Sequence, residues 1–460
     1  MPMRMPDFGI FKTNTITPHA PYHSLGSGRM KISRRDFIKG VAAAGALTCA
    51  GKWIGVKDVF SNDLKSQIFR VYACPEHDGQ MRHHGLDTLL DLMADNGIKF
   101  YRTNKAHRWG GSAGIIEADD VVLIKVNGQW KCRGTTNTDV LRGLIHRILE
   151  HPDGFNGEVV IFENGQGRGG FDGLSQGGSS YSAWPEVDNQ VCVNAEEQDL
   201  LTVDYLVYNV FKNDPVSSFL LDPVRSIFIS GADKITNGYR KISGISYPCF
   251  TTLMEHRIEL QEGIWTGSEY AENLKLINLP VLKTHAGTGI TGALKHTYGI
   301  VSMDDGSSSI RHYSQSGTQC GKMWGLVRAP DLNIVDCIWV SPDSLTGYPV
   351  STTHRANTLL AGIDPVALDY YGSKHILYPL SGPYEDRHHP DTDPGLINHL
   401  TGAREFINST GGILGEPAQM GDENIEVLST SAGGKIDEGR DTISSGGGGG
   451  AGCFISTSRR

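Results

Sequence analysis

Short apolar runs that alternate with helical patterns are the feature that most constrains the fold of this chain. We expect strands over 121–124, 158–162, 222–231, 276–282, 331–336 and 358–361. A segment from Thr135 to Thr138 can cap a helix whose apolar residues recur at helical spacing as far as Ile148. Strands that alternate with helices predict an α/β fold, with a mostly parallel, Rossmann-like sheet, helices on both faces and long loops.

Polar side chains follow several of these predicted strands, at the point where each strand ends. They are Lys125, Asn127, Glu163, Asn164, Lys283, His285 and Asp364. In open parallel sheets, ligands bind outside the carboxyl ends of the strands. The sequence therefore predicts one composite site to which these residues contribute.

The segment 276–301 carries the densest chemistry. An apolar run ends in Lys283-Thr284-His285, a glycine-rich turn follows, and a short helical segment then carries Lys295, His296 and Tyr298. We expect Lys283, His285 and Lys295 to be the catalytic residues.

The glycines 287, 289 and 292 fit the G-x-G-x-x-G pattern of dinucleotide sites, as do glycines 165, 167 and 170. Neither copy is a convincing Rossmann fingerprint, because the first has no clean second strand leading to an acidic residue about 20 positions on, and the second has no helix after it. Backbone N–H groups at a helix N-terminus can still hold an anion. We therefore predict an anion or cofactor site formed by Lys125, Asn127, Gly287, Gly289 and Thr291, with a simple tight turn as the alternative.

His285, His296 and His312 can serve as metal ligands or as general acid/base groups. The candidate metal set is His285, Glu163 and Asp364, and ligands of this kind favour zinc, manganese or iron, so a divalent metal is a candidate cofactor. Asp364-Pro365 also has a structural interpretation, because Asp is a good N-cap and Pro suits the first helical position. Both interpretations of Asp364 stay open.

Residues 31–40, KISRRDFIKG, resemble a twin-arginine export signal. The apolar stretch 41–50 that follows is too short to span a bilayer, which needs roughly 20 residues, and it fits the h-region of a cleaved signal. We expect a signal over 30–50, a mature chain from Gly51, and a non-native or disordered start over 1–29, with Met30 as the true start. The expected partner is the twin-arginine export machinery, and the expected location is the periplasm or the cell envelope, with no transmembrane helix in the mature chain.

Charge and cysteine spacing exclude two classes of function. The formal net charge is -9, which argues against nucleic acid as a partner, because phosphate binding needs a basic face. The cysteines after the signal are scattered without a Cys-x-x-Cys pair, so we expect no iron–sulfur cluster. Their number is odd, so at least one is free, modified or intermolecular; they are Cys74, Cys132, Cys192, Cys249, Cys320, Cys337 and Cys453.

Two long segments, VVLIKVNGQWKCRGTTNTDVLRGLIHRIL and LKLINLPVLKTHAGTGITGALKHTYGIVS, resemble the family named domain of unknown function 362. PDLNIVDCIWV and LLAGIDPVALDYYG are similar to its later motifs, so the resemblance covers roughly 118–375. It implies a fold and a candidate site, but no substrate. The tail GGGGGAGCFIST resembles a Gly-rich linker with a Cys-Phe-Ile box, which suggests processing at Cys453.

These observations predict an α/β domain over 65–410, a C-terminal extension over 411–443 and a flexible tail over 444–460. The first functional hypothesis is an exported enzyme acting on a small anionic substrate, with a composite anion or metal site. The alternative is a non-catalytic metal- or anion-binding protein of the cell envelope, and a third is a structural envelope protein.

Overall fold

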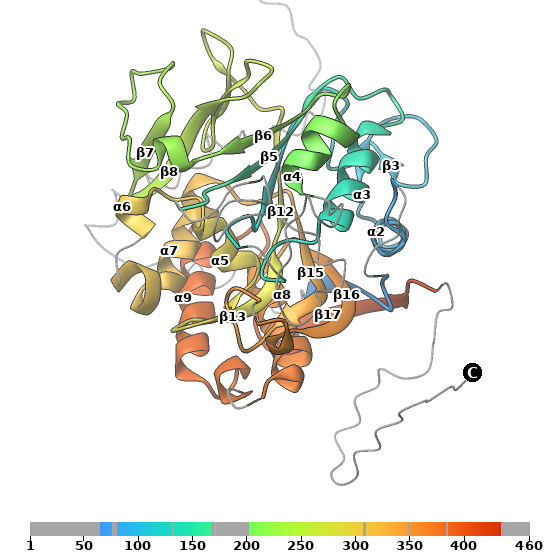
Figure 1. The fold of residues 1–460 in the computed structure, drawn as a ribbon, viewed down its shortest axis with the longest axis vertical. Coiled ribbons are helices and arrows are strands. Elements are labelled where there is room, and N and C mark those ends of the chain that lie inside the picture. Colours follow the sequence, from blue (N-terminus) through green and yellow to red (C-terminus); the bar gives the residue numbers. More distant parts are fainter. Residues whose placement is uncertain are drawn as a thin grey trace, which may run out of the picture. The chain divides into compact units, whose positions relative to one another are not determined.

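The computed structural model describes residues 65–433, except 76–80, 131–132, 167–170, 172–201, 307–309, 348 and 383–384. Within this part a ten-stranded sheet has the order β17-β1-β16-β15-β12-β4-β5-β6, and β13 pairs with β14 and β15 (Figure 1). Its strands are β1 (Ser66–Tyr72), β4 (Val121–Val126), β5 (Glu158–Glu163), β6 (Val216–Leu220), β12 (Leu274–Leu279), β13 (Val281–His285), β14 (Gly289–Thr291), β15 (Leu332–Ser341), β16 (His354–Gly362) and β17 (Ile425–Ser431).

The centre of this sheet is parallel. β4 pairs in parallel with β5 and β12, β5 with β6, and β15 with both β12 and β13. β16 runs antiparallel to its neighbours β15 and β1. The carboxyl ends of β4, β5 and β13 therefore lie at one edge of the sheet, whereas β16 ends at the opposite edge.

Helices cover both faces of the sheet, which confirms the predicted α/β class. α2 (His84–Asp95), α3 (Thr138–Leu149) and α4 (Val203–Tyr205) share one core with alternate residues of β4 and β5, such as Ile124 and Ile161. On the other face, α5 (Ala293–Tyr298), α7 (Ser316–Lys322), α8 (Pro365–Gly372) and α9 (Pro394–Ser409) share a second core with Leu123 and Phe162. Figure 1 shows the two groups of helices on either side of the central strands. The Rossmann-like detail stays a prediction.

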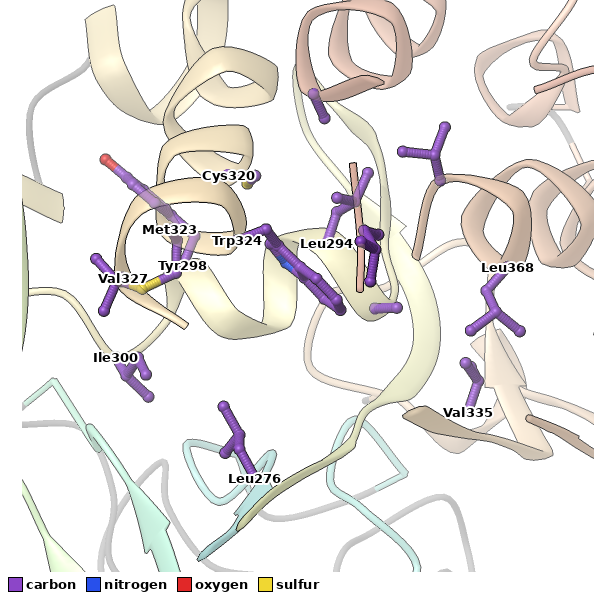
Figure 2. Close-up of a cluster of buried hydrophobic side chains, with 14 of the residues drawn as sticks. Leu276, Leu294, Tyr298, Ile300, Cys320, Met323, Trp324, Val327, Val335 and Leu368 are labelled. Carbon is purple, nitrogen blue, oxygen red and sulfur yellow. The ribbon is translucent and has the colours of Figure 1, made fainter. Parts of the chain in front are cut away.

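α5 is short but well anchored. Figure 2 shows its residues Leu294 and Tyr298 among Cys320, Met323 and Trp324 of the α7 region, and all five are buried. This packing fixes the backbone of α5 and hence the Cα positions of Lys295 and His296, which lie between Leu294 and Tyr298.

A second sheet was not expected from the sequence. It has the order β11-β10-β9-β8-β7 and is antiparallel throughout, with the strands β7 (Gly238–Ile242), β8 (Ile245–Thr251), β9 (Arg257–Glu259), β10 (Gly263–Trp265) and β11 (Tyr270–Ala271). Its Phe250 stacks on Phe162 of β5 and Phe219 of β6. The five-stranded sheet thus packs against the large sheet at β5 and β6. A third, two-stranded sheet pairs β2 (Tyr101–Arg102) with β3 (Gly110–Gly111).

One predicted strand is wrong, and β1, β6, β14 and β17 of the large sheet were not predicted. The segment 222–231 begins with a 3₁₀ turn, Asp222–Val224, and contributes only an isolated bridge at Phe228. Pro223 near its start favours this turn, because proline cannot donate to a ladder. The sheet strand is instead β6, just before it, whose short sequence VSSFL carries little apolar periodicity.

Local chemistry explains the elements nearest the predicted site. Asn137, within the predicted capping segment, begins α3 by accepting from the backbone N–H of Asp139 at 2.9 Å. Pro280 separates β12 from β13, and α6 (Met303–Gly306) follows α5. Several predicted features lie outside the described residues: the segment 1–29, the signal, nearly all of the glycine-rich loop 165–194, and the tail with Cys453. In the part of the chain that is described, no helix is long and apolar enough to cross a membrane.

The approach of β5 to β4 provides a test of this packing. Because a Cβ added at Gly157 would overlap the backbone carbonyl of Asp120, we expect Gly157→Ala to lower the free energy of unfolding by about 1–3 kcal/mol. Gly231→Ala is the control, since its Cβ would meet nothing within 4 Å. Denaturant unfolding measures both, and equal stabilities of the two variants would contradict this account of the β4–β5 junction.

Candidate functional site

A cavity of about 310 Å³ lies at the carboxyl ends of β4, β5 and β13. It brings together seven of the ten predicted site residues, namely Lys125, Asn127, Glu163, Lys283, His285, Thr291 and Lys295. His296, Tyr298 and His312 also line it, as do Trp130 and Tyr313. The convergence follows from the parallel pairing of the strands, and the function of these residues stays a prediction.

One wall of the cavity is a buried ion pair. Lys125 Nζ lies 2.9 Å from Glu163 Oε2 and 2.9 Å from the carbonyl oxygen of Val126. Glu163 also accepts from the backbone N–H groups of Gly128 and Asn164, at 3.1 and 2.8 Å. Burial lowers the pKa of Lys125 and raises the pKa of Glu163, while each partner's charge opposes that effect on the other. Every strong polar group of this wall is satisfied internally.

Asn127 joins β4 to β13. Its Oδ1 accepts from the backbone N–H of Val281 at 2.9 Å, and its own N–H donates to Thr136 Oγ1 at 2.8 Å. These bonds give Asn127 a structural role beside its place in the cavity wall.

Lys283 is only 2% exposed and has a different environment. Its Nζ donates to the carbonyl oxygen of Gly134 at 2.6 Å, and within the described residues it forms no ion pair. Burial lowers its pKa to about 7, with Glu163 opposing the shift and Lys125 adding to it. The Lys283 amine therefore changes between its charged and its neutral form near neutral pH.

Lys295 lies on α5, and its Nζ donates to the carbonyl oxygen of His312 at 3.2 Å. The same Nζ lies 5.2 Å from the ring centroid of Tyr298. Burial lowers the pKa of Lys295 to about 8. The Tyr298 hydroxyl is buried and has no hydrogen-bond partner among the described residues.

His285 and His312 face each other with their Nε2 atoms 3.1 Å apart. His312 Nδ1 lies 3.1 Å from the carbonyl oxygen of Gly306, so that nitrogen must carry the proton and donate. His312 Nε2 is then the acceptor, and His285 donates through its own Nε2–H. This tautomer leaves a lone pair on His285 Nδ1, which is buried and has no hydrogen-bond partner among the described residues.

His285 and His296 are both held in the neutral form. Burial, followed by the positive charge of Lys295, holds its pKa well below the usual range, so the ring is neutral. His296 is likewise held neutral by burial; its Nδ1 lies 2.6 Å from Asn278 Oδ1, and its Nε2 has no hydrogen-bond partner in the described part. Buried polar atoms without partners call for an explanation, and a bound molecule is one.

The predicted role of Gly287 and Gly289 requires correction. They lie in the β13–β14 hairpin, where His285 pairs with Gly289, and both have positive φ, of 82° and 73°. They therefore form a tight turn and do not line the cavity.

The helix that follows the hairpin already has an internal anion. The Asp369 carboxylate accepts from the backbone N–H groups of Ala293 and Leu294, at 2.6 and 3.1 Å, and a Cβ on Gly292 would overlap it. The N-terminus of α5 thus has no place for a substrate anion.

The predicted metal set is not brought together. Asp364 follows β16, the reversed strand, so it lies at the opposite edge of the sheet and caps α8 through Val366 and Ala367. Its other oxygen accepts from Ser66 at 2.5 Å. Among the described residues, no group of three His, Cys, Asp or Glu side chains could hold a metal ion. The structural interpretation of Asp364 accounts for its contacts.

A larger cavity, of about 730 Å³, lies against α2 and α3. Its charged residues pair with one another: Arg147 Nε is 2.7 Å from Asp87, and Arg82 is 2.8 Å from Glu150. The cavity of about 310 Å³, hereafter the lysine cavity, instead has three lysines and one carboxylate in its lining, and two of its buried ring nitrogens, His285 Nδ1 and His296 Nε2, have no hydrogen-bond partner among the described residues.

Of the additional lining residues, Trp130 and Tyr313 were missed. Trp130 follows Asn127 by three positions, and Tyr313 adjoins His312, so proximity to the predicted residues was the available signal. Neither Trp130 nor Tyr313 belongs to a periodic apolar pattern from which its place in the cavity could be predicted.

The geometry thus defines an α/β protein whose cavity is lined by lysines and lies at the carboxyl ends of parallel strands. The sequence model described as Domain of unknown function (DUF362) matches residues 236–374, and that described as TAT (twin-arginine translocation) pathway signal sequence matches residues 31–51. The chain thus carries a DUF362 region over 236–374 and a signal for export by the twin-arginine machinery, which confirms the resemblance to each over these residues. The predicted resemblance over 118–235 stays a prediction. Comparisons with curated proteins and with solved structures found no match.

The DUF362 match spans β7 to α8 and therefore includes Lys283, His285, Thr291 and Lys295. Lys125, Asn127 and Glu163 precede it. The cavity is accordingly shared between the matched region and the strands before it.

The two strand lysines, Lys125 and Lys283, should respond oppositely to substitution. Lys125→Met leaves the Glu163 carboxylate buried without its cation, and we expect it to lower the free energy of unfolding by about 3–5 kcal/mol. Lys283→Met removes a buried cation that has no carboxylate partner, at the cost of one hydrogen bond worth about 1 kcal/mol. We expect it to leave stability unchanged or to raise it.

The sign of the pH dependence follows from the pKa of Lys283, which burial lowers to about 7. Between that value and its usual pKa the unfolded chain binds the proton and the folded chain does not, so this group makes wild-type stability rise with pH. The difference in free energy of unfolding between Lys283→Met and the wild type should thus favour the variant most below pH 7 and should shrink as the pH rises. Denaturant unfolding of the variant and the wild type at pH 6.5 and pH 9 measures this difference. If Lys283→Met lost as much stability as Lys125→Met, the environments described for the two lysines would be wrong.

Proposed function

We propose that this exported protein is an enzyme acting on a small anionic substrate in the lysine cavity. The observation that carries the proposal is a charge imbalance: three buried lysines line the cavity with one carboxylate, Glu163, and that carboxylate pairs with Lys125. Lys283 and Lys295 form no ion pair within the described residues. A buried cation without a counterion is costly unless an anion joins it.

Each wall has a distinct part in this proposal. Lys283 and Lys295 hold the anionic group, and Lys125, Asn127 and Glu163 line the same cavity on the side of Lys283. His285 presents an unprotonated Nδ1 and can take a proton from the substrate. The cavity volume of about 310 Å³ lies at the lower end of the range for small-molecule sites, which suits a small substrate.

The alternative is a non-catalytic binding protein of the cell envelope. Of its two versions, anion binding is favoured over metal binding, because His285 and His312 have no third ligand among the described side chains. A His285 ring nitrogen without a hydrogen-bond partner among the described residues, close to Lys295, favours proton transfer, and so an enzyme, over simple binding.

Anion binding should take up protons. The pKa values of Lys283 and Lys295 are lowered to about 7 and 8, and a bound anion favours the charged lysines, so it raises both values. Affinity for inorganic phosphate should therefore fall as the pH rises from 7 to 9. Titration calorimetry in buffers of different ionisation enthalpy measures the proton uptake.

Matched variants locate that effect. Lys283→Met and Lys295→Met should each weaken phosphate binding at least about tenfold, since a hydrogen bond to a charged group contributes about 1.5–3 kcal/mol. Lys212→Met, at an exposed position, is the control. Phosphate and small carboxylates that bind neither the wild type nor these variants, or bind all of them equally, would remove the basis of the proposal.

His285→Gln separates an enzyme from a binding protein. Mass spectrometry of the natively folded, exported protein would first identify a bound anion, and turnover of that compound would then be assayed. We expect His285→Gln to lower turnover by about 10²–10⁴-fold while the fold and most of the ligand affinity are kept. A variant with unchanged turnover and affinity would contradict the role of His285, and a loss of affinity without any wild-type turnover would favour the binding protein.

A further inference from the structure

The two lysines without ion pairs, Lys283 and Lys295, have different neighbours. The charged groups that act on Lys283 are Glu163 and Lys125. Lys295 instead acts on His285, beside His312, and donates to the His312 carbonyl. Lys283 therefore lies near a carboxyl group, and Lys295 lies near the neutral imidazole of His285 and near His312.

Lys283 lies on a strand of the central sheet. It projects from β13, where it is paired with Thr291 of β14, and is only 2% exposed. Its one hydrogen-bond acceptor among the described residues is the carbonyl oxygen of Gly134, a neutral group. No carboxylate holds the proton on this amine.

Burial of Lys283 disfavours its ammonium form relative to the neutral amine. A desolvated amine beside another cation is how proteins prepare a lysine for nucleophilic attack on carbonyl compounds. The lowering of the Lys283 pKa to about 7 agrees with this geometry.

We propose that Lys283 forms a Schiff base with a small anionic carbonyl compound, an aldehyde acid or a 2-oxo acid, whose anionic group is held by Lys295. This inference rests on the proposed function of the cavity and names its substrate class.

The step is balanced within the site. The neutral Nζ attacks the carbonyl carbon and forms a C–N bond, and a proton from the nitrogen passes to the carbonyl oxygen to give a carbinolamine. The C–O bond then breaks, the hydroxyl leaves as water after receiving a proton, and a C=N bond remains. The two protons of the amine thus leave with the carbonyl oxygen as water, and no oxidant or reductant is required.

Borohydride trapping tests the proposal. The full mature protein is incubated with glyoxylate or pyruvate at pH 7.5, sodium borohydride is added, and peptides are analysed by mass spectrometry. We expect a reduced adduct on Lys283 at a level at least about tenfold above that on the exposed Lys212. Lys283→Arg should lose this adduct and keep the fold.

Lys295→Met gives a second readout. It should raise the glyoxylate concentration needed for half-maximal labelling of Lys283 at least about fivefold and leave the maximal labelling unchanged. Inorganic phosphate should compete with labelling in the wild type.

The outcomes distinguish this inference from the proposed function. Glyoxylate is small enough for a cavity of about 310 Å³, so phosphate binding that depends on Lys283 and Lys295 without any adduct on Lys283 would overturn the Schiff base alone. Labelling of Lys283 no faster than that of Lys212 would do the same. Neither binding nor adduct would overturn both.

Discussion

The parallel pairing of β4 with β5 and β12 is the constraint on which the rest of the site depends. In this register Lys125 lies opposite Phe162, one residue before Glu163, and opposite Asn278 on β12. The buried Lys125–Glu163 bond at 2.9 Å then joins the ends of two neighbouring strands. Because β13 continues along β15 after Pro280, Lys283 and His285 reach the same edge of the sheet, and the cavity forms between these ends.

The sequence was sufficient for residues that end a buried apolar run whose strand lies parallel to its neighbours. The strands that end near Lys125, Glu163 and His285 are buried apolar runs, and parallel packing brings their ends together without further information. Asp364 shows the limit: its strand has the same apolar character, but it runs the other way. Nothing local in an apolar run encodes direction, because direction is fixed by the connections and by the partner strand.

The glycine-rich segment shows a second limit. Its spacing fits both an anion-binding turn and a hairpin, and the difference lies in a contact across 76 residues, between Ala293 and the Asp369 carboxylate. That carboxylate satisfies the start of α5 from inside the protein, which removes the anion site that the helix would otherwise offer. Burial raises its pKa to about 7. The β7–β11 sheet was missed for a related reason, since strands of two to seven residues give little periodicity to detect.

The lysine cavity combines two uses of buried charge that have opposite effects on stability. Lys125 is compensated by a carboxylate and by the Val126 carbonyl, so its removal exposes a second buried charge and is costly. Lys283 and Lys295 are held by neutral carbonyl oxygens, which satisfy hydrogen bonds without stabilising a full charge. A fold that needed only stability would replace them with apolar side chains of similar length. That they are buried as lysines, next to a histidine whose Nδ1 has no hydrogen-bond partner among the described residues, is the physical reason to assign this cavity a chemical function.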